Sequence, residues 1–197
     1  MLTKLITEIR NCQLCKPDLP HGPRPVIQLA KEARLLIIGQ APGVRVHETG
    51  IPWNDKSGDR LRSWLQLDKS VFYDPNKVAI VPMGFCYPGK GRSGDLPPRP
   101  ECAPTWHSSI LNQLPQIELI LLIGSYSQSY YLEGSSFLKS HKTLTARVKN
   151  YEDCPEPYFL LPHPSPRNQI WLSKNRWFES TILPRLRVRI ERLSLNG

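Results

Sequence analysis

Four short runs of aliphatic and β-branched residues constrain the fold of this chain more than any other feature. They cover residues 34–39, 77–81, 117–123 and 158–161, bounded by Gly, Pro or charged residues. Runs of this length and composition are typical of buried strands. Helical patterns occupy residues 59–67, 104–114 and 126–132, with further helices expected near 3–10 and 176–193. This alternation predicts an α/β fold in three layers, α/β/α, around a four-stranded parallel sheet.

The length of the chain indicates a single domain over residues 1–197. A chain of 197 residues can fill one core but is short for two ordinary domains. No run is apolar over the length of a membrane span, and the N-terminus lacks the pattern of a secretory signal. We therefore expect a cytoplasmic protein with no membrane partner, and we also expect a monomer.

The charge balance favours an anionic partner. The chain has 26 Lys and Arg against 17 Asp and Glu, a formal net charge of +9. Nucleic acid is the usual partner of such a chain, because neutralised phosphates release counterions. A basic solvated surface without a partner is the alternative. The last helical segment, residues 185–192, is expected to present a solvated basic face.

The cysteines have a spacing that needs an explanation other than disulfides, which are rare in a reducing compartment. Cys12 and Cys15 form a C-x-x-C after the first predicted helix, and Cys86 and Cys102 follow far along the chain. Four thiolates from three separate segments suit an iron-sulfur cluster, whose ligands converge from several directions. A zinc site, which usually pairs two C-x-x-C motifs, and unligated cysteines are the alternatives. Cys154 is expected to be an ordinary thiol.

The loops expected after the four strands carry the residues of most chemical interest. Sheets of this kind bind ligands outside the carboxyl ends of their strands. Many of the 20 prolines fall in these connections, which indicates ordered loops over a rigid sheet. The four loops are Gly39-Gln-Ala-Pro-Gly43, Pro82-Met-Gly-Phe-Cys86, Gly124-Ser-Tyr126 and His163-Pro-Ser-Pro-Arg-Asn168.

These motifs together resemble those of the iron-sulfur uracil-DNA glycosylases. The resemblance rests on the cysteine spacing, the GQAPG loop, the stretch Thr49-Gly-Ile-Pro-Trp-Asn-Asp-Lys-Ser-Gly58 and the His-Pro-Ser loop, and it covers most of the chain. It implies a four-stranded parallel sheet between helices and a 4Fe-4S cluster on the four spaced cysteines. It also implies a DNA-repair enzyme of base excision repair, which hydrolyses the bond between uracil, or a related deaminated base, and its sugar.

A base that is cut from DNA must first leave the stack and enter a pocket. Trp53 is expected to stack on the flipped base, a contact worth roughly 1–3 kcal/mol. The backbone amides of Gln40 and Ala41 are expected to bond the pyrimidine oxygens. The alternatives are a core role for Trp53 and an ordinary turn after the first strand.

Cleavage of a glycosidic bond needs a donor to the departing base and a negative group on the sugar side. His163 is the expected donor. Asp55 is the first choice for orienting water or stabilising the sugar cation, with His47 and Glu48 in reserve. The alternative for Asp55 is a helix N-cap. No lysine occupies a matched catalytic position, so a monofunctional enzyme without a Schiff-base step is predicted.

Two positions depart from the pattern of the relatives. Gln40 stands where some relatives carry an acid, and glutamine cannot act as a base. Pro82 stands where many uracil-selective relatives carry an asparagine, and proline offers no side-chain hydrogen bond to the base. The resemblance therefore leaves bases beyond uracil open. A non-catalytic iron-sulfur protein that binds nucleic acid on the same fold is the alternative function, and redox sensing is a third.

Contacts to DNA are expected from the same loops. Ser57 at a helix N-terminus, Ser165 and Arg167 are expected to hold flanking phosphates. Ile170 and Trp171 form an apolar knuckle among basic residues, which suits a wedge that fills the gap left by a flipped base. Packing of Trp171 against the last helix is the alternative.

Overall fold

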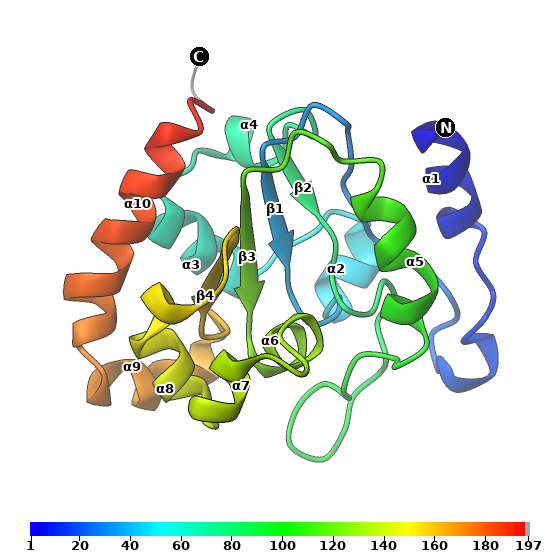
Figure 1. Ribbon diagram of the computed structural model, residues 1–197. Coiled ribbons are helices and arrows are strands. Elements are labelled where there is room, and N and C mark those ends of the chain that lie inside the picture. Colours follow the sequence, from blue (N-terminus) through cyan, green and yellow to red (C-terminus); the bar gives the residue numbers. More distant parts are fainter. Residues whose placement is uncertain (196–197) are drawn as a thin grey trace.

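The computed structural model describes residues 1–195, and a four-stranded sheet lies at its centre (Figure 1). All neighbouring strands are parallel, in the order β2-β1-β3-β4. The α/β class and the parallel sheet expected from the sequence are thus confirmed. The last two residues of the expected 1–197 domain lie outside the described part. The strands are β1 (Leu35–Ile38), β2 (Val78–Ile80), β3 (Leu119–Ile123) and β4 (Tyr158–Leu161).

The strands read as continuous apolar runs because helices cover both faces of the sheet. Every strand residue is buried except Tyr158, which is half-buried at the start of β4. The register places Leu35 of β1 opposite both Val78 and Leu119, and Ile120 opposite Tyr158. The central strand β1 therefore has neighbours on both sides and no free edge.

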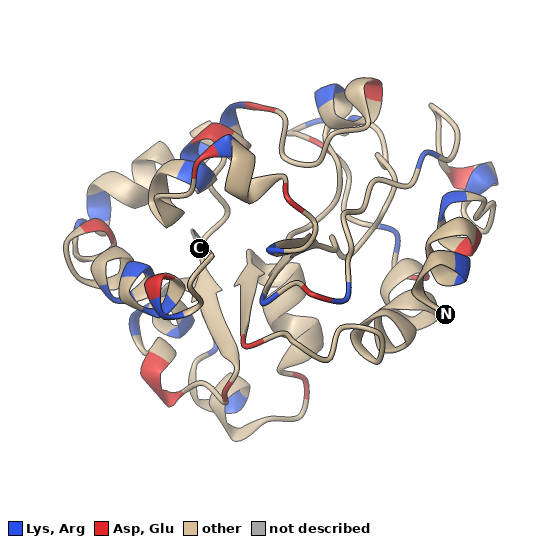
Figure 2. Cartoon of the chain, turned by 90° about the horizontal axis from the view of Figure 1, so that it is seen from above, with Lys and Arg blue, Asp and Glu red and all other residues tan. Residues whose placement is uncertain are grey.

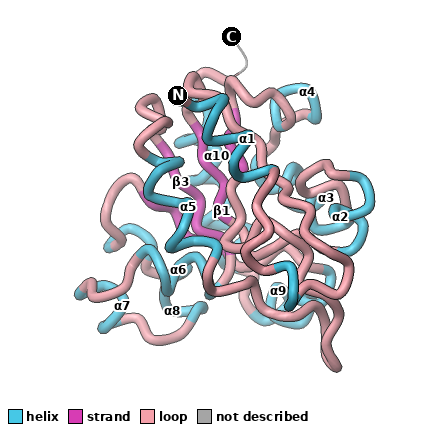
Figure 3. Tube along the Cα trace, turned by 90° about the vertical axis from the view of Figure 1, so that its right-hand side faces the viewer, coloured by secondary structure: helices cyan, strands magenta, loops and turns pink. Residues whose placement is uncertain are grey.

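Helices flank the sheet on its two faces. The helices α1 and α5 lie side by side on one face, and α3 and α10 pack together on the other (Figures 1 and 3). None of the helices in the described residues is long and apolar enough to cross a membrane. The α-helices are α1 (Leu2–Arg10), α2 (Val44–Thr49), α3 (Lys56–Leu65), α4 (Lys69–Phe72), α5 (Cys102–Leu111), α6 (Ser125–Tyr131), α7 (Ser136–Ser140), α8 (Leu144–Lys149), α9 (Gln169–Lys174) and α10 (Leu183–Arg192).

The C-terminal helix differs from its prediction in two ways. The expected helix at 176–193 includes a π-helical turn at Phe178–Ile182 before α10 begins. Its basic face is not simply solvated: Arg185 and Arg189 form ion pairs with acids near the start of β4, and Arg187 Nε donates to the Trp64 carbonyl at 3.0 Å. Basic and acidic residues are interspersed around the molecule (Figure 2). Arg185, Arg187 and Arg189 therefore bind other segments of the same chain.

The carboxyl ends of the four strands share one edge of the sheet, at the bottom of Figure 1. From β1 the chain first adds β2 on one side and then crosses to β3 on the other. The strand order thus reverses between β1 and β3, which opens a crevice between the loops that follow them. This edge is where the fold places a ligand.

Candidate active site

The loops that follow the strands line one cavity with a volume of about 580 Å³. Each strand contributes to it: Gln40 follows β1, Pro82 follows β2, Gly124 follows β3 and His163 follows β4. The side-chain amide nitrogen of Gln40 lies 3.3 Å from the point where a Cβ on Gly124 would stand. The β1 and β3 loops therefore meet at the crevice where the strand order reverses, and Ala41 lines the cavity beside Gln40.

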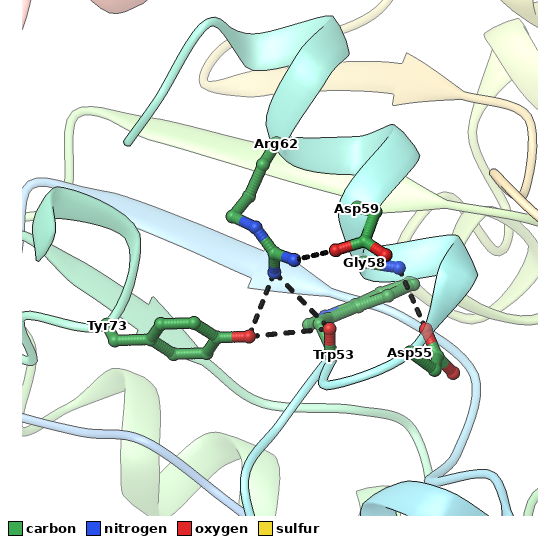
Figure 4. Close-up of polar contacts among 6 residues, drawn as sticks. All are labelled: Trp53, Asp55, Gly58, Asp59, Arg62 and Tyr73. Atoms are coloured by element: carbon green, nitrogen blue, oxygen red, sulfur yellow. Dashed lines mark hydrogen bonds and ion pairs between the residues drawn. The ribbon is translucent and has the colours of Figure 1, made fainter. Parts of the chain in front are cut away.

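Trp53 forms one wall of the cavity in an unusual backbone conformation. Its φ of 56° lies in the left-handed region, which is costly for a bulky residue and persists only where the surroundings enforce it. Two donors hold the Trp53 carbonyl: Arg62 Nη1 at 3.3 Å and the Tyr73 hydroxyl at 3.4 Å (Figure 4). Arg62 is itself buried and paired with Asp59 at 2.5 Å. This network fixes the direction in which Trp53 projects.

Two glycines make room for Trp53. A Cβ on Gly58 would stand 1.7 Å from the Trp53 carbonyl oxygen, and a Cβ on Gly39 would stand 2.7 Å from the indole ring. Both distances are far below van der Waals contact, so neither position accommodates a side chain without movement of the backbone or the ring. The indole therefore lies directly on the backbone at the end of β1.

His163 presents a defined tautomer to the cavity. Its Nδ1 accepts a hydrogen bond from the Ser165 backbone N–H at 3.2 Å, so the neutral imidazole carries its proton on Nε2. The Asn168 side chain donates to the His163 carbonyl at 2.6 Å, and the imidazole lies 5.7 Å from the Trp53 ring, centroid to centroid.

Enclosure determines the charge of His163. The residue keeps some exposure at the cavity, yet the ring is largely enclosed, and this burial lowers its pKa to about 4. The Asp55 carboxylate acts in the opposite direction and only partly offsets the burial. Near neutral pH, His163 is thus an uncharged hydrogen-bond donor.

Asp55 caps a helix and also lines the cavity. Its Oδ1 accepts a hydrogen bond from the Gly58 backbone N–H at 2.8 Å, which satisfies one of the free donors at the start of α3. Such a cap is typically worth about 1 kcal/mol. The same carboxylate faces the cavity and influences the pKa of His163. The N-cap interpretation of Asp55 is therefore confirmed, and the same residue also lies at the cavity.

The two reserve candidates, His47 and Glu48, do not reach the cavity. Both lie on α2, whose Val46 side faces the cavity instead. The His47 ring packs against those of His21 and Tyr87, and burial lowers its pKa. Glu48 is exposed. The helix turns both of these residues away from the carboxyl ends of the strands.

The residues expected to contact DNA surround the mouth of the cavity. Ser57, Ser165 and Arg167 line it. Ile170, at the start of α9, is 69% exposed. Trp171 is half-buried: its Nε1 donates to the Thr145 hydroxyl at 2.8 Å, and its ring packs on neighbouring aromatic side chains. Of the apolar knuckle, Ile170 is thus free to project, whereas Trp171 supports the cavity wall.

A loop that the sequence did not assign to the active site covers part of the cavity. Residues 93–96, between Cys86 and Cys102, line it. Arg167 Nη1 donates to the Ser93 carbonyl at 2.9 Å and ties this loop to the loop after β4. The only signal in the sequence is a Gly-Arg-Ser-Gly-Asp turn between prolines, which predicts a loop without indicating where it lies.

Four cysteines line a second, small cavity: Cys12, Cys15, Cys86 and Cys102. The rest of its lining is mostly apolar, and the Cys102 sulfur accepts a hydrogen bond from the Phe85 N–H at 3.4 Å. Burial raises the pKa of the Cys86 thiol to about 11 and that of Cys102 to about 12.

Within residues 1–195 no group of three or more His, Cys, Asp or Glu side chains is arranged to hold a metal ion. Cys154, the cysteine expected to be an ordinary thiol, is buried in the segment just before β4. It is not part of the lining of the small cavity.

A comparison with known families agrees with this arrangement. A family model described as Uracil DNA glycosylase superfamily matches residues 27–187. The chain belongs to this superfamily. Membership supports a DNA glycosylase, a hydrolase of DNA repair that acts on deaminated bases in DNA. The matched part of this superfamily member includes the loops after all four strands and begins beyond Cys12 and Cys15.

The glycine at position 58 of this superfamily member provides a test of the Trp53 wall. We expect Gly58→Ala to lower the free energy of unfolding by at least about 2 kcal/mol, because the new methyl group overlaps the Trp53 carbonyl. Urea unfolding followed by circular dichroism measures this loss. Ser63→Ala, at an exposed position of the same helix, is the matched control. Equal urea midpoints for Gly58→Ala and wild type would contradict the arrangement.

Proposed function

We propose that this protein excises uracil or a related deaminated base from DNA by hydrolysis of the N-glycosidic bond. One observation carries the proposal: a neutral imidazole donor, an aromatic face and a carboxylate share one cavity. These are His163, Trp53 and Asp55. Together they supply what a departing base and an electron-poor sugar require.

The cavity suits a single flipped base. Its volume of about 580 Å³ leaves space for a base and part of its sugar beside the walls. A base extruded from the duplex loses stacking worth a few kcal/mol, and stacking on an aromatic side chain returns roughly 1–3 kcal/mol. Trp53 offers that face next to His163. The backbone at Gln40 and Ala41 lies at the end of β1, where its amides can bond the oxygens of a pyrimidine.

The reaction breaks the bond between C1′ and the base nitrogen, and the bonding electron pair leaves with the base. The Nε2–H of His163 donates a hydrogen bond to a base oxygen and stabilises the resulting negative charge. Asp55 stabilises the positive charge on the sugar and orients the attacking water. The water oxygen bonds to C1′, and its proton balances the departing base, which leaves as the neutral compound.

Specificity follows from the floor of the cavity. Pro82 lines the cavity, and its side chain offers no hydrogen bond to the edge of a base. The buried imidazole of His107 donates from Nε2 to the Pro82 carbonyl at 3.1 Å. Without a polar side chain at this position, the cavity excludes few bases by hydrogen bonding. We therefore propose activity on several deaminated bases, with uracil among them.

DNA is held around the mouth of the cavity. Ser57, Ser165 and Arg167 line the cavity and are the residues proposed to contact the phosphates that flank the flipped nucleotide. Ile170, with 69% of its surface exposed, is the residue proposed to fill the gap in the stack. The formal net charge of +9 favours binding of the duplex as a whole.

Excision is tested with oligonucleotides that carry a single uracil, hypoxanthine or xanthine, as duplexes and as single strands. Alkali cleaves the strand wherever a base has been removed, and we expect cleavage with at least one of the three bases. His163→Ala and Asp55→Asn should each slow excision by at least about 100-fold. Asparagine retains the helix cap, so Asp55→Asn removes the charge alone.

Asp68→Asn is the matched control for Asp55→Asn. Asp68 also precedes a helix, α4, but its exposed side chain makes no capping bond. Binding of DNA without cleavage at any of the bases would favour a non-catalytic binding protein. Unchanged rates in both His163→Ala and Asp55→Asn would remove these two residues from the mechanism.

We also propose that the four cysteines of the small cavity hold an iron-sulfur cluster. The chemistry of the donors supports this proposal, because four thiols from three segments line one cavity with mostly apolar walls. Cys12, Cys15, Cys86 and Cys102 would hold it. The cluster would supply cross-links that tie the N-terminal segment to both ends of the loop over the active site.

The cluster proposal predicts iron and acid-labile sulfide in equal amounts in protein purified without oxygen, with visible absorption from thiolate-to-iron bands. Cys86→Ser should lose most of this iron. Cys154→Ser is the matched control, because Cys154 is also buried but lies outside the cavity, and it should keep its iron. Stoichiometric zinc without iron would contradict the proposal.

A further inference from the structure

A second carboxylate, that of Asp95, reaches the active-site cavity from the loop between Cys86 and Cys102. The loop folds back on itself: the Gly91 N–H donates to the Gly94 carbonyl at 2.6 Å, and the Leu96 N–H donates to the Gly89 carbonyl at 2.9 Å. These bonds make a tight hairpin with Asp95 on its returning strand. The position of Asp95 is therefore set by backbone bonds within the loop.

The carboxylates of Asp95 and Asp55 both lie near one point beside Gly43. A Cβ built on Gly43 would lie 3.5 Å from Asp95 Oδ2 and 3.9 Å from Asp55 Oδ2. The Oδ1 atom of each carboxylate is engaged elsewhere: Asp55 Oδ1 accepts from the Gly58 N–H, and Asp95 Oδ1 accepts from the Tyr87 hydroxyl at 3.4 Å. It is thus the Oδ2 atoms that face the shared point.

Tyr87 holds Asp95 in this position. Its ring is buried and stacks on His21. Its hydroxyl donates the 3.4 Å hydrogen bond to Asp95 Oδ1. Arg167, which also lines the cavity, directs its Nη1 to the Ser93 carbonyl. The two carboxylates therefore face the cavity as a pair of like charges.

Two like charges near one point favour a cation between them. At an effective dielectric constant of about 20, a unit charge attracts a cation several ångströms away by more than the thermal energy. The reaction proposed above creates a positive charge on the deoxyribose ring as the base departs. The charge distribution of the pair thus matches the transition state better than the uncharged ground state.

We propose that Asp95 is a second anionic group of the active site and shares with Asp55 the stabilisation of the sugar cation. This inference rests on the proposed function and adds a residue to it. Tyr87 is the positioning residue for Asp95. The loop over the active site therefore contributes a charge to the reaction in addition to covering the cavity.

The test compares binding to two DNA duplexes with abasic-site analogues. One carries a pyrrolidine, which is protonated at neutral pH, and the other carries an uncharged tetrahydrofuran. Fluorescence anisotropy should show that the wild-type protein binds the cationic analogue roughly tenfold or more tightly. Asp95→Asn should lower that preference by roughly 5–10-fold with unchanged affinity for the uncharged analogue, and should slow excision by roughly tenfold.

Three further variants sharpen the result. Asp95→Glu keeps the charge and should recover part of the preference for the cation. Tyr87→Phe should lower the preference by less than Asp95→Asn does, because the carboxylate remains but loses its donor. Asp68→Asn, an exposed acid outside the cavity, should behave as the wild type.

An Asp95→Asn protein with a native melting curve and the full wild-type preference for the cationic analogue would overturn the inference. Absence of that preference in the wild type would also overturn it. If no deaminated base is excised but the preference exists and depends on Asp95, the inference stands and the proposed excision fails. The two proposals are thus distinguishable.

Discussion

The conformation of Trp53 is the constraint on which the active site depends. Its left-handed backbone is held by Arg62 and Tyr73 and fits only because position 58 is glycine. In this conformation the indole covers the end of β1 and faces His163. It is part of the enclosure that keeps the imidazole neutral. The strained backbone of Trp53 thus positions the ring on which a base would stack and helps to enclose the donor, His163.

The sheet and its edge were predictable because their signals are local. The strand around Leu36 reads as a continuous apolar run, since both faces of the sheet are covered. Because the strands are parallel, the residues that follow their carboxyl ends lie at one edge of the sheet. His163 was found in this way, whereas Asp55 was found through the resemblance of residues 49–58 to a family motif; the structure brings both to the cavity.

The positions of the other residues of the site depend on contacts between distant segments, which no local sequence pattern encodes. Arg62 reads as an ordinary exposed position of a helix, yet it is buried because the Trp53 carbonyl needs a donor. Asp95 lies in a loop without periodicity, and its place over the cavity follows from the hairpin and from Arg167. His47 shows the reverse case: it is near the motif in sequence, but α2 turns it away from the cavity.

The central claim is that an enclosed, neutral His163 donates from Nε2 to the departing base. The most direct test is the pH dependence of base release in a single turnover. Because burial lowers the pKa of His163 to about 4, the rate should stay level as the pH falls from 8 to about 5. It should change only as the pH approaches 4. A transition near pH 6.5, the ordinary value for histidine, that disappears in His163→Ala would contradict the account.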